Sequence, residues 1–347
     1  PGKPRRFVGV DGGVRAVMTR LPLEGPESWI GADIVDANDW RYPLSESDIG
    51  ELDTALADVN AAGWKWDEIT KDRFPLGPLG DKLADVSEEL ESGCGVVKLS
   101  SLPVLRYSDE DLRSIFYGVG THLGTPVGQN GARGLMRDIR DNSKNGGKRV
   151  DSTDGLRWHT DRADVVGLLG VRSASSGGTS RLVSVPAIHN AMLERRPDLV
   201  DVLFDDFHRY SPGDEVGIEA GSYVLPVFGL REGYFTSHFS RTYIEQAEML
   251  PDVPSLTLAQ VEAIGLLCEL ADELGFEMPI NPGDMQFLNN HVTYHGRTPF
   301  QDNGAGCDGR LLFRIWLSTP NSRPLPESHS VLWGSVEAGA IRGGAGA

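Results

Sequence analysis

Cysteine is scarce in this chain of 347 residues, and the way it is distributed excludes several classes of protein. The three cysteines, Cys94, Cys268 and Cys307, lie far apart and are odd in number, and no Cys-x-x-Cys pair occurs. A disulfide framework and a thiolate zinc site are therefore both unsupported. This pattern is typical of a protein from a reducing compartment.

Long hydrophobic runs and an excess of basic residues are also missing. Apolar stretches such as residues 165–171 are too short to span a bilayer, and residues 1–6 lack the apolar segment of a signal peptide. Acidic residues number 50 against 33 basic ones, which gives a formal net charge of −17 spread along the chain. This balance argues against nucleic acid and anionic membranes as partners, and we expect a cytoplasmic protein.

What the chain does contain is enough apolar sequence for a folded core, with 39% hydrophobic and 24% charged residues. Capping residues and apolar periodicity predict helices over residues 45–61, 82–90, 108–123 and 257–274. Alternating or apolar runs predict strands over residues 96–99, 156–161, 165–172, 179–185, 285–288 and 310–317, and a hairpin over 224–237. Helices lie early or as insertions and many short strands lie late. This order predicts a mixed α+β, mainly β fold: an antiparallel double-sheet barrel flanked by helices.

One short segment of this pattern carries a candidate metal site. If residues 156–161 form a strand, alternation places His159 and Asp161 on the same face. One further imidazole would complete a 2-His-1-carboxylate set, which leaves three coordination positions open and suits Fe(II). The pattern alone is weak, because a histidine on a strand is more often a hydrogen-bonded core or surface residue.

Two histidines, His291 and His295, compete to be the third ligand. They are four residues apart, so on a strand they would share a face and spacing does not choose between them. The remaining histidines lack a comparable context, and we expect them to be structural or exposed: His122, His189, His208, His238 and His329.

The predicted strand over residues 310–317 carries two arginines on one face. Arg310 and Arg314 alternate with apolar residues, and the opposite face is wholly apolar. If both faces are covered, each guanidinium needs an anion, because an unpaired buried charge costs several kcal/mol. The alternatives are that one face is open to solvent, or that each arginine meets an internal carboxylate.

Five motifs follow one another along the chain: His159-x-Asp161, Gly177-Gly178-Thr179-Ser180, Gly283 to Asn290, His295-Gly296-Arg297 and Arg310-x-x-x-Arg314. Such an ordered set is far more specific than any one motif. It resembles the taurine dioxygenase/TfdA-like (TauD/TfdA) branch of Fe(II)- and 2-oxoglutarate-dependent oxygenases, and the resemblance covers roughly residues 90–325.

The resemblance implies a double-stranded β-helix (jelly roll) over residues 79–326, with an N-terminal extension over 1–78 packed on it and a tail over 327–347. It implies iron held by His159, Asp161 and His295, since Gly-Arg directly follows His295 and not His291. It also implies 2-oxoglutarate as co-substrate, with its far carboxylate on Arg310 helped by a hydroxyl of Thr179 or Ser180. A guanidinium fork suits that carboxylate.

Arg314 is then expected to hold an anionic group of a small, carboxylate-bearing substrate such as an amino acid or a specialised metabolite. Further candidates for contact with this substrate are polar residues of the segment 129–138, which precedes the predicted 156–161 strand. They are Gln129, Asn130 and Asp138, and Trp40 is another candidate.

The expected chemistry uses O2 and hydroxylates an unactivated C–H bond with release of succinate and CO2. Halogenating relatives lack the carboxylate that Asp161 supplies, while desaturation or ring formation stays open. Two rivals remain. One is a zinc or nickel enzyme with the same ligands. The other is a non-enzymatic jelly roll that binds an acidic metabolite through Arg310 and Arg314.

Overall fold

The computed structural model describes residues 20–129, 134–141, 152–213, 220–302 and 309–345. Cys307, Asn130 and residues 1–6 lie outside this part of the chain. Within it, the helices are α2 (Gly31–Ile34), α3 (Glu46–Ala62), α4 (Pro78–Ser92), α5 (Asp109–Leu123), α6 (Val185–Arg195), α7 (Pro197–Leu203), α8 (Arg241–Ala247), α9 (Leu258–Leu274) and α10 (Ser330–Trp333).

Three of these helices begin at the capping residues that predicted them. Ser45, Ser108 and Thr257 each accept a hydrogen bond from the backbone three residues later, and each forms a full capping box. The predictions of α3, α5 and α9 are thus confirmed. Helix α4 runs further than predicted in both directions; its earlier start is explained by Pro78, which fits at the first turn.

The strands are short except at the centre. They are β1 (Arg41–Pro43), β2 (Val96–Ser100), β3 (Thr125–Pro126), β4 (Met136–Ile139), β5 (Leu156–His159), β6 (Val165–Arg172), β7 (Ser176–Gly177), β8 (Ser180–Ser184), β9 (Asp206–Ser211), β10 (Gly221–Pro226), β11 (Phe228–Arg231), β12 (Tyr234–Ser237), β13 (Phe276–Met278), β14 (Met285–Asn289), β15 (Thr293–Arg297), β16 (Phe300–Gln301) and β17 (Leu311–Ser318).

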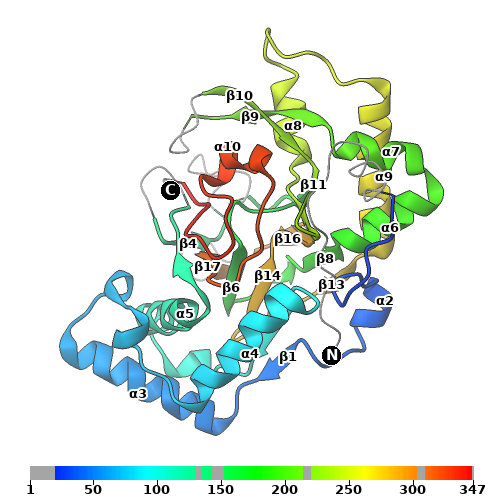
Figure 1. Ribbon diagram of the computed structural model, residues 1–347. Coiled ribbons are helices and arrows are strands. Elements are labelled where there is room, and N and C mark those ends of the chain that lie inside the picture. The colour runs from blue at the N-terminus through cyan, green and yellow to red at the C-terminus, as the bar shows by residue number, and fades with distance from the viewer. Residues whose placement is uncertain (1–19, 130–133, 142–151, 214–219, 303–308, 346–347) are drawn as a thin grey trace.

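Two sheets form the centre of the molecule (Figure 1). The larger has the order β1-β2-β14-β6-β17-β3, with β4 also paired to β17, and the smaller has the order β13-β8-β15-β5. Alternate residues of the larger sheet, such as Leu169 and Phe313, pack with α3, α4 and α5 in one core. Its other face, including Val166 and Trp316, packs with Leu182 of the smaller sheet.

The outer face of the smaller sheet is covered by α6, α7 and α9. Its residues Val183 and Tyr294 share a second core with those helices. The layers are therefore helices, large sheet, small sheet and helices, a mixed fold with a sheet-rich centre. The space between the two sheets is where the functional side chains of β5, β15 and β17 meet.

Two strand predictions need correction. Strand β5 ends at His159, so Asp161 lies in the following loop. Beyond His159 the backbone no longer pairs with β15, and the N–H of Thr160 donates instead to the carbonyl of Phe239, 2.9 Å away. The predicted hairpin over 224–237 is also wrong in its first part. Residues 221–226 pair with β9, and only β11 and β12 form the hairpin.

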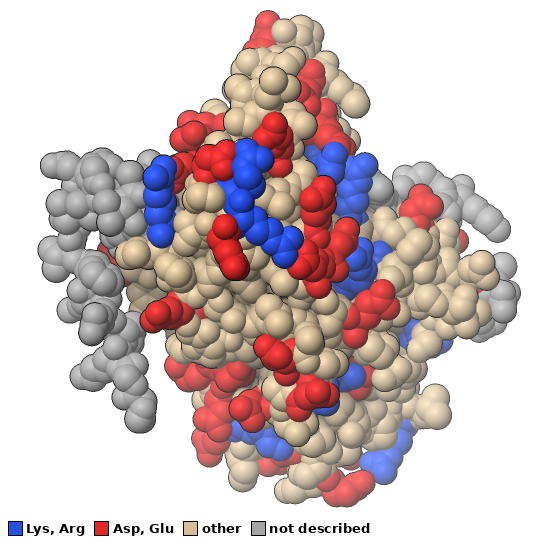
Figure 2. All heavy atoms as spheres, turned by 90° about the vertical axis from the view of Figure 1, so that its right-hand side faces the viewer, with Lys and Arg blue, Asp and Glu red and all other residues tan. Residues whose placement is uncertain are grey.

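The surface carries the charge that the composition predicts. Figure 2 shows acidic and basic side chains interspersed on one face of the molecule. Exposed pairs such as Arg195 with Glu273 (2.6 Å) and Arg196 with Glu262 (3.1 Å) are of the kind that adds little to stability. No helix in the described part of the chain has the length and apolarity to cross a membrane.

Candidate active site

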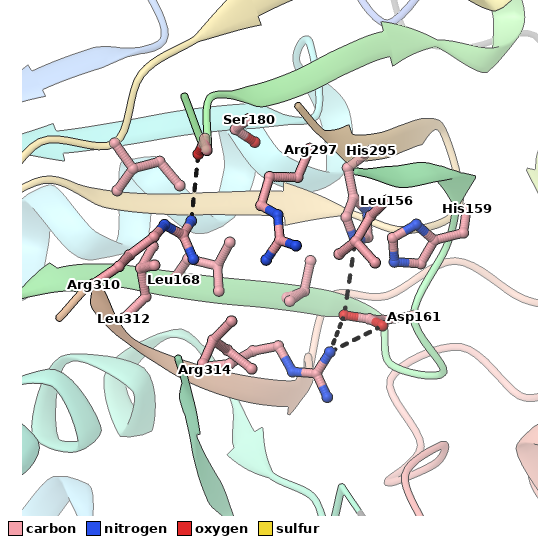
Figure 3. A pocket seen from close by; sticks show the side chains of 15 residues that line it. Leu156, His159, Asp161, Leu168, Ser180, His295, Arg297, Arg310, Leu312 and Arg314 are labelled. Atoms are coloured by element: carbon pink, nitrogen blue, oxygen red, sulfur yellow. Dashed lines mark hydrogen bonds and ion pairs between the residues drawn. The ribbon is translucent and has the colours of Figure 1, made fainter. Parts of the chain in front are cut away.

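His159, Asp161 and His295 come together between the two sheets (Figure 3). His295 of β15 lies directly opposite His159 of β5 in the sheet register, and their ring centroids are 4.3 Å apart. One ligand atom from each of the three residues lies within 4.8 Å of the other two. Two imidazoles and one carboxylate at this spacing form a donor set suited to Fe(II) with open positions.

Hydrogen bonds fix the orientation of this group. The Nδ1–H of His159 donates to the carbonyl of Arg157 at 2.8 Å, which leaves Nε2 as the atom available to a metal. Asn290 holds the loop after β5: its Oδ1 accepts from the backbone N–H of Asp161 at 3.0 Å, and its Nδ2 donates to Ala163 O at 2.9 Å. One oxygen of Asp161 also accepts the indole N–H of Trp316.

The electrostatics favour the metal-binding protonation states. Burial would raise the pKa of Asp161, but Arg314 and the two histidines, with the Trp316 hydrogen bond, outweigh it and lower that pKa. Burial and the neighbouring His159 lower the pKa of His295 to about 3. An ionised carboxylate and a neutral imidazole are the forms that bind a divalent cation.

His291, the alternative third ligand, is engaged elsewhere. Its Nε2 lies 2.8 Å from Asp164 Oδ1 and its Nδ1 lies 2.9 Å from Thr236 Oγ1. The ring is 1% exposed, and it is His295 that faces Asp161. The structure therefore brings together the set that the motif after His295 indicated.

A narrow cavity of ≈ 60 Å³ leads from this group to Arg310 (Figure 3). Leu156, Leu168 and Leu312 form its apolar walls. Ser180 is buried and lines the cavity, whereas Thr179 is not among the lining residues and its backbone N–H donates to Thr298 Oγ1.

Arg310 at the end of this cavity has an unsatisfied guanidinium nitrogen. Its Nη2 donates to the carbonyl of Gly178 at 3.3 Å, while Nη1 is buried without a hydrogen-bond partner among the described residues. Burial and the neighbouring Arg297 lower the pKa of Arg310 to about 9, against the influence of Asp302. A buried guanidinium in this condition fits a ligand carboxylate.

A second, wider pocket of ≈ 550 Å³ opens on the other side of the metal-binding group. His159, Asp161 and Arg314 line both spaces, so the group lies between them. Arg314 is not free in this structure: its Nη1 lies 3.4 Å from both oxygens of Asp161, and its Nε donates to Gln129 Oε1 at 2.8 Å. The sequence left open whether such an arginine faces solvent or meets an internal carboxylate. Arg314 meets an internal carboxylate, that of Asp161.

Two of the substrate-contact candidates lie away from both pockets. Trp40 is buried in the core between the sheets and donates its indole N–H to Ile34 O. Asp138 pairs with Arg113 at 2.6 Å and with Arg140. Gln129 lines the outer pocket as expected.

Several pocket residues were not found from the sequence. Arg297 lines the inner cavity, and Arg137, Arg162, Tyr210 and His238 line the outer pocket. Arg297 belongs to the motif His295-Gly296-Arg297 and Arg162 directly follows Asp161, a signal that could have been used. His238 was expected to be structural or exposed; it is 4% exposed, and nothing in its local sequence shows that it faces a pocket.

Comparison with known proteins identifies the family of this chain. The model of the taurine catabolism dioxygenase TauD, TfdA family matches residues 64–316. FR-33289 synthase of Streptomyces rubellomurinus is 29% identical, over 91% of this chain and 96% of its own length. The taurine hydroxylase-like protein SAT17 of Stachybotrys chartarum is 27% identical, over 86% of this chain and 80% of its own.

Solved structures share the fold at lower identity. Asparagine oxygenase with Fe(II), 2S,3S-3-hydroxyasparagine and succinate has a TM-score of 0.66 at 16% identity, covering 80% of this chain and 94% of its own. The non-haem iron oxygenase OrfP with Fe and alpha-ketoglutaric acid has a TM-score of 0.62 at 18% identity, with the same two coverages. The chain belongs to the taurine catabolism dioxygenase TauD, TfdA family and is a non-haem oxygenase that uses Fe(II), 2-oxoglutarate and O2.

Proposed function

We propose that this enzyme hydroxylates an unactivated C–H bond of a small, carboxylate-bearing molecule. In the balanced reaction, O2 and 2-oxoglutarate are consumed, one oxygen atom enters the substrate, and succinate and CO2 leave. One observation carries the proposal: the His159, Asp161 and His295 group separates a cavity that ends at an unsatisfied arginine from a wider pocket.

In this proposal the two histidines and Asp161 hold the iron, and Arg310 binds the far carboxylate of 2-oxoglutarate, assisted by Ser180 or Thr179. The bound iron supplies the oxygen chemistry, which no side chain can perform. The chain itself orients the co-substrate and keeps water out, because the walls between Arg310 and the metal-binding group are apolar. Asp161 occupies the ligand position that a halogenating enzyme needs for halide, so hydroxylation is preferred.

The charges of the outer pocket support an anionic substrate. Arg137, Arg162 and Arg314 line it, and Asp161 is the one carboxylate among its described lining residues. A fourth arginine of the wall, Arg157, is paired with Glu245 at 2.6 Å. We assign Arg314 and Gln129 to the substrate, together with Asn130, which follows Gln129 in sequence. The substrate's anion would then share Arg314 with Asp161, or replace that contact.

The relatives support an amino acid or a similar small acid. Structures of similar fold hold hydroxyasparagine or hydroxyarginine. We also propose that the two sheets are the halves of a double-stranded β-helix, and that it occupies residues 79–326, between an N-terminal extension and a C-terminal segment.

The test is succinate formation from 2-oxoglutarate with Fe(II) and ascorbate across a panel of amino acids and organic acids. At least one compound should stimulate succinate release and gain one oxygen atom by mass spectrometry. His159→Ala should abolish both signals. A zinc or nickel enzyme would not consume 2-oxoglutarate, and a binding protein would retain its ligand in His159→Ala; either result would overturn the proposal. A product that loses two hydrogens instead of gaining oxygen would show desaturation or ring closure.

A further inference from the structure

The last part of the chain is built into the molecule. The family match ends at residue 316, yet Arg323, Trp333 and Arg342 beyond it are 5%, 1% and 0% exposed. Figure 1 shows this C-terminal segment, residues 320–345, folding back over the protein, with α10 near β9 and β10. Such burial is unlike that of a trailing tail.

Arg342 ties this segment to the loop that carries Asp161. Its Nε donates to Asp164 Oδ1 at 2.8 Å, and Nη2 and Nη1 donate to the carbonyls of Arg323 and Glu337 at 2.7 and 3.2 Å. Asp164 also accepts from His291 Nε2 and from the backbone N–H of Thr319. The loop residue three positions after Asp161 is therefore the anchor for the C-terminal segment.

Beyond Arg342 the chain joins two walls of the outer pocket. The backbone N–H of Gly344 donates to Arg162 O, and that of Ala345 donates to Gly128 O, both at 2.7 Å. Arg162 and Gln129, the neighbour of Gly128, line the outer pocket, as does Leu332 of α10. The segment thus supplies one wall residue itself and holds the backbone of two other wall regions.

The turn that makes these bonds depends on glycine. Gly343 and Gly344 have φ values of +73° and +69°, which side-chain-bearing residues rarely adopt. A Cβ at Gly344 would lie 2.8 Å from Gly128 O and 2.8 Å from Val127 Cβ. A larger residue there must push the segment away from the pocket wall without touching the Arg342–Asp164 ion pair.

We propose that the C-terminal segment is a structural wall of the outer pocket. Arg342 is the positioning residue: its ion pair with Asp164 holds the segment in place, so that Arg162 and Gln129 face the substrate. The geometry itself does not depend on the proposed function; only the identity of the pocket's occupant does. The segment then determines the affinity for the substrate. The affinity of the three-residue group for the metal and that of the inner cavity for the co-substrate do not depend on it.

The test compares Arg342→Met and Gly344→Val with Ile341→Ala, a control at a neighbouring side chain that is 67% exposed. Hydrogen exchange of the full-length variants, measured by mass spectrometry without substrate, should speed up about tenfold in residues 127–129 and 160–164 in both variants and not in the control. Gly344→Val keeps the result interpretable if Arg342→Met folds poorly, because it leaves the buried ion pair intact.

A kinetic arm uses the compound of the acid panel that releases most succinate. The KM for that compound should rise about tenfold in Gly344→Val, while the KM for the oxo-acid co-substrate changes less than about twofold. Arg342→Lys keeps a positive charge beside Asp164, so it should recover part of the protection from hydrogen exchange that Arg342→Met loses. Faster exchange confined to residues 341–345, or an equal rise in both KM values, would overturn the proposal. The hydrogen-exchange measurement needs no substrate, so it tests this inference even if no compound of the panel reacts. A failure of the proposed function can therefore be told apart from a failure of this inference.

Discussion

Trp316 donates its indole N–H to a carboxylate oxygen of Asp161 at 2.9 Å. Both residues are buried, and Arg314, two positions earlier on the same face of β17, contacts the same carboxylate. Strand β17 therefore supplies Arg314, directly follows Arg310 and orients the one acidic ligand candidate. Partners of this kind keep a ligand in position before the metal arrives.

Replacing Trp316 by Phe should weaken Fe(II) binding about tenfold, because the indole donor is lost while the ring's bulk is largely kept. Anaerobic equilibrium dialysis measures the affinity. Trp40→Phe is the matched control: that indole is also buried and also donates a hydrogen bond, to Ile34 O, away from the site. Equal losses in the two variants would mean that the effect comes from general destabilisation and not from Asp161.

Arg310→Met should raise the KM for the co-substrate, 2-oxoglutarate, about 10- to 100-fold, the range expected when a charge-assisted hydrogen bond is lost. The Nη1 of Arg310 is buried without a partner among the described residues, so a bound carboxylate would satisfy it. Succinate release at varied co-substrate concentration measures the effect. A 2-oxo acid without the far carboxylate, such as 2-oxobutyrate, should discriminate little between the variant and the parent enzyme. If the variant lost activity equally with both oxo acids, Arg310 would not bind that carboxylate.

Arg314→Leu should raise the KM for the substrate about tenfold or more, and far more than the KM for the co-substrate. The guanidinium faces the outer pocket as well as the inner cavity, and it is not at the end that Arg310 occupies. Because Arg314 also contacts Asp161, Fe(II) affinity must be measured in the same variant and used to correct the comparison. An equal rise in both KM values at saturating iron would refute the division of roles between the two arginines.

The parts of the fold that the sequence predicted are those encoded locally. Ser45, Ser108 and Thr257 cap their helices as expected, and the alternation over residues 310–317 reproduces β17 to within one residue. The His295 context pointed to the histidine that the structure places beside His159 and Asp161. These signals lie within a few residues of the feature that they specify, so no knowledge of distant contacts is needed.

What the sequence did not reveal depends on segments that meet only in the folded chain. His238 reaches the outer pocket because the backbone after β12 bonds to Thr160, and Arg342 reaches Asp164 from 178 positions away. The end of β5 at His159 has the same cause. Arg314 was expected to bind an anionic group of the substrate, but the carboxylate of Asp161 already lies beside it. Such pairings are set by tertiary packing, which overrides local periodicity.

The buried histidine His291 predicts how stability changes with pH. Burial lowers its pKa from 6.5 to about 4, although Asp164 opposes the shift. Between these two values the unfolded chain binds a proton that the folded chain does not, so the free energy of unfolding should fall as pH drops from about 6.5 to about 4. The loss should be on the order of a few kcal/mol, and urea denaturation of the metal-free protein across this range measures it.

His291→Gln should be less stable at neutral pH, because contacts to Asp164 and Thr236 are disturbed, but its stability should depend less steeply on pH. Parallel curves for the two proteins would show that other groups, and not His291, carry the proton linkage in this window.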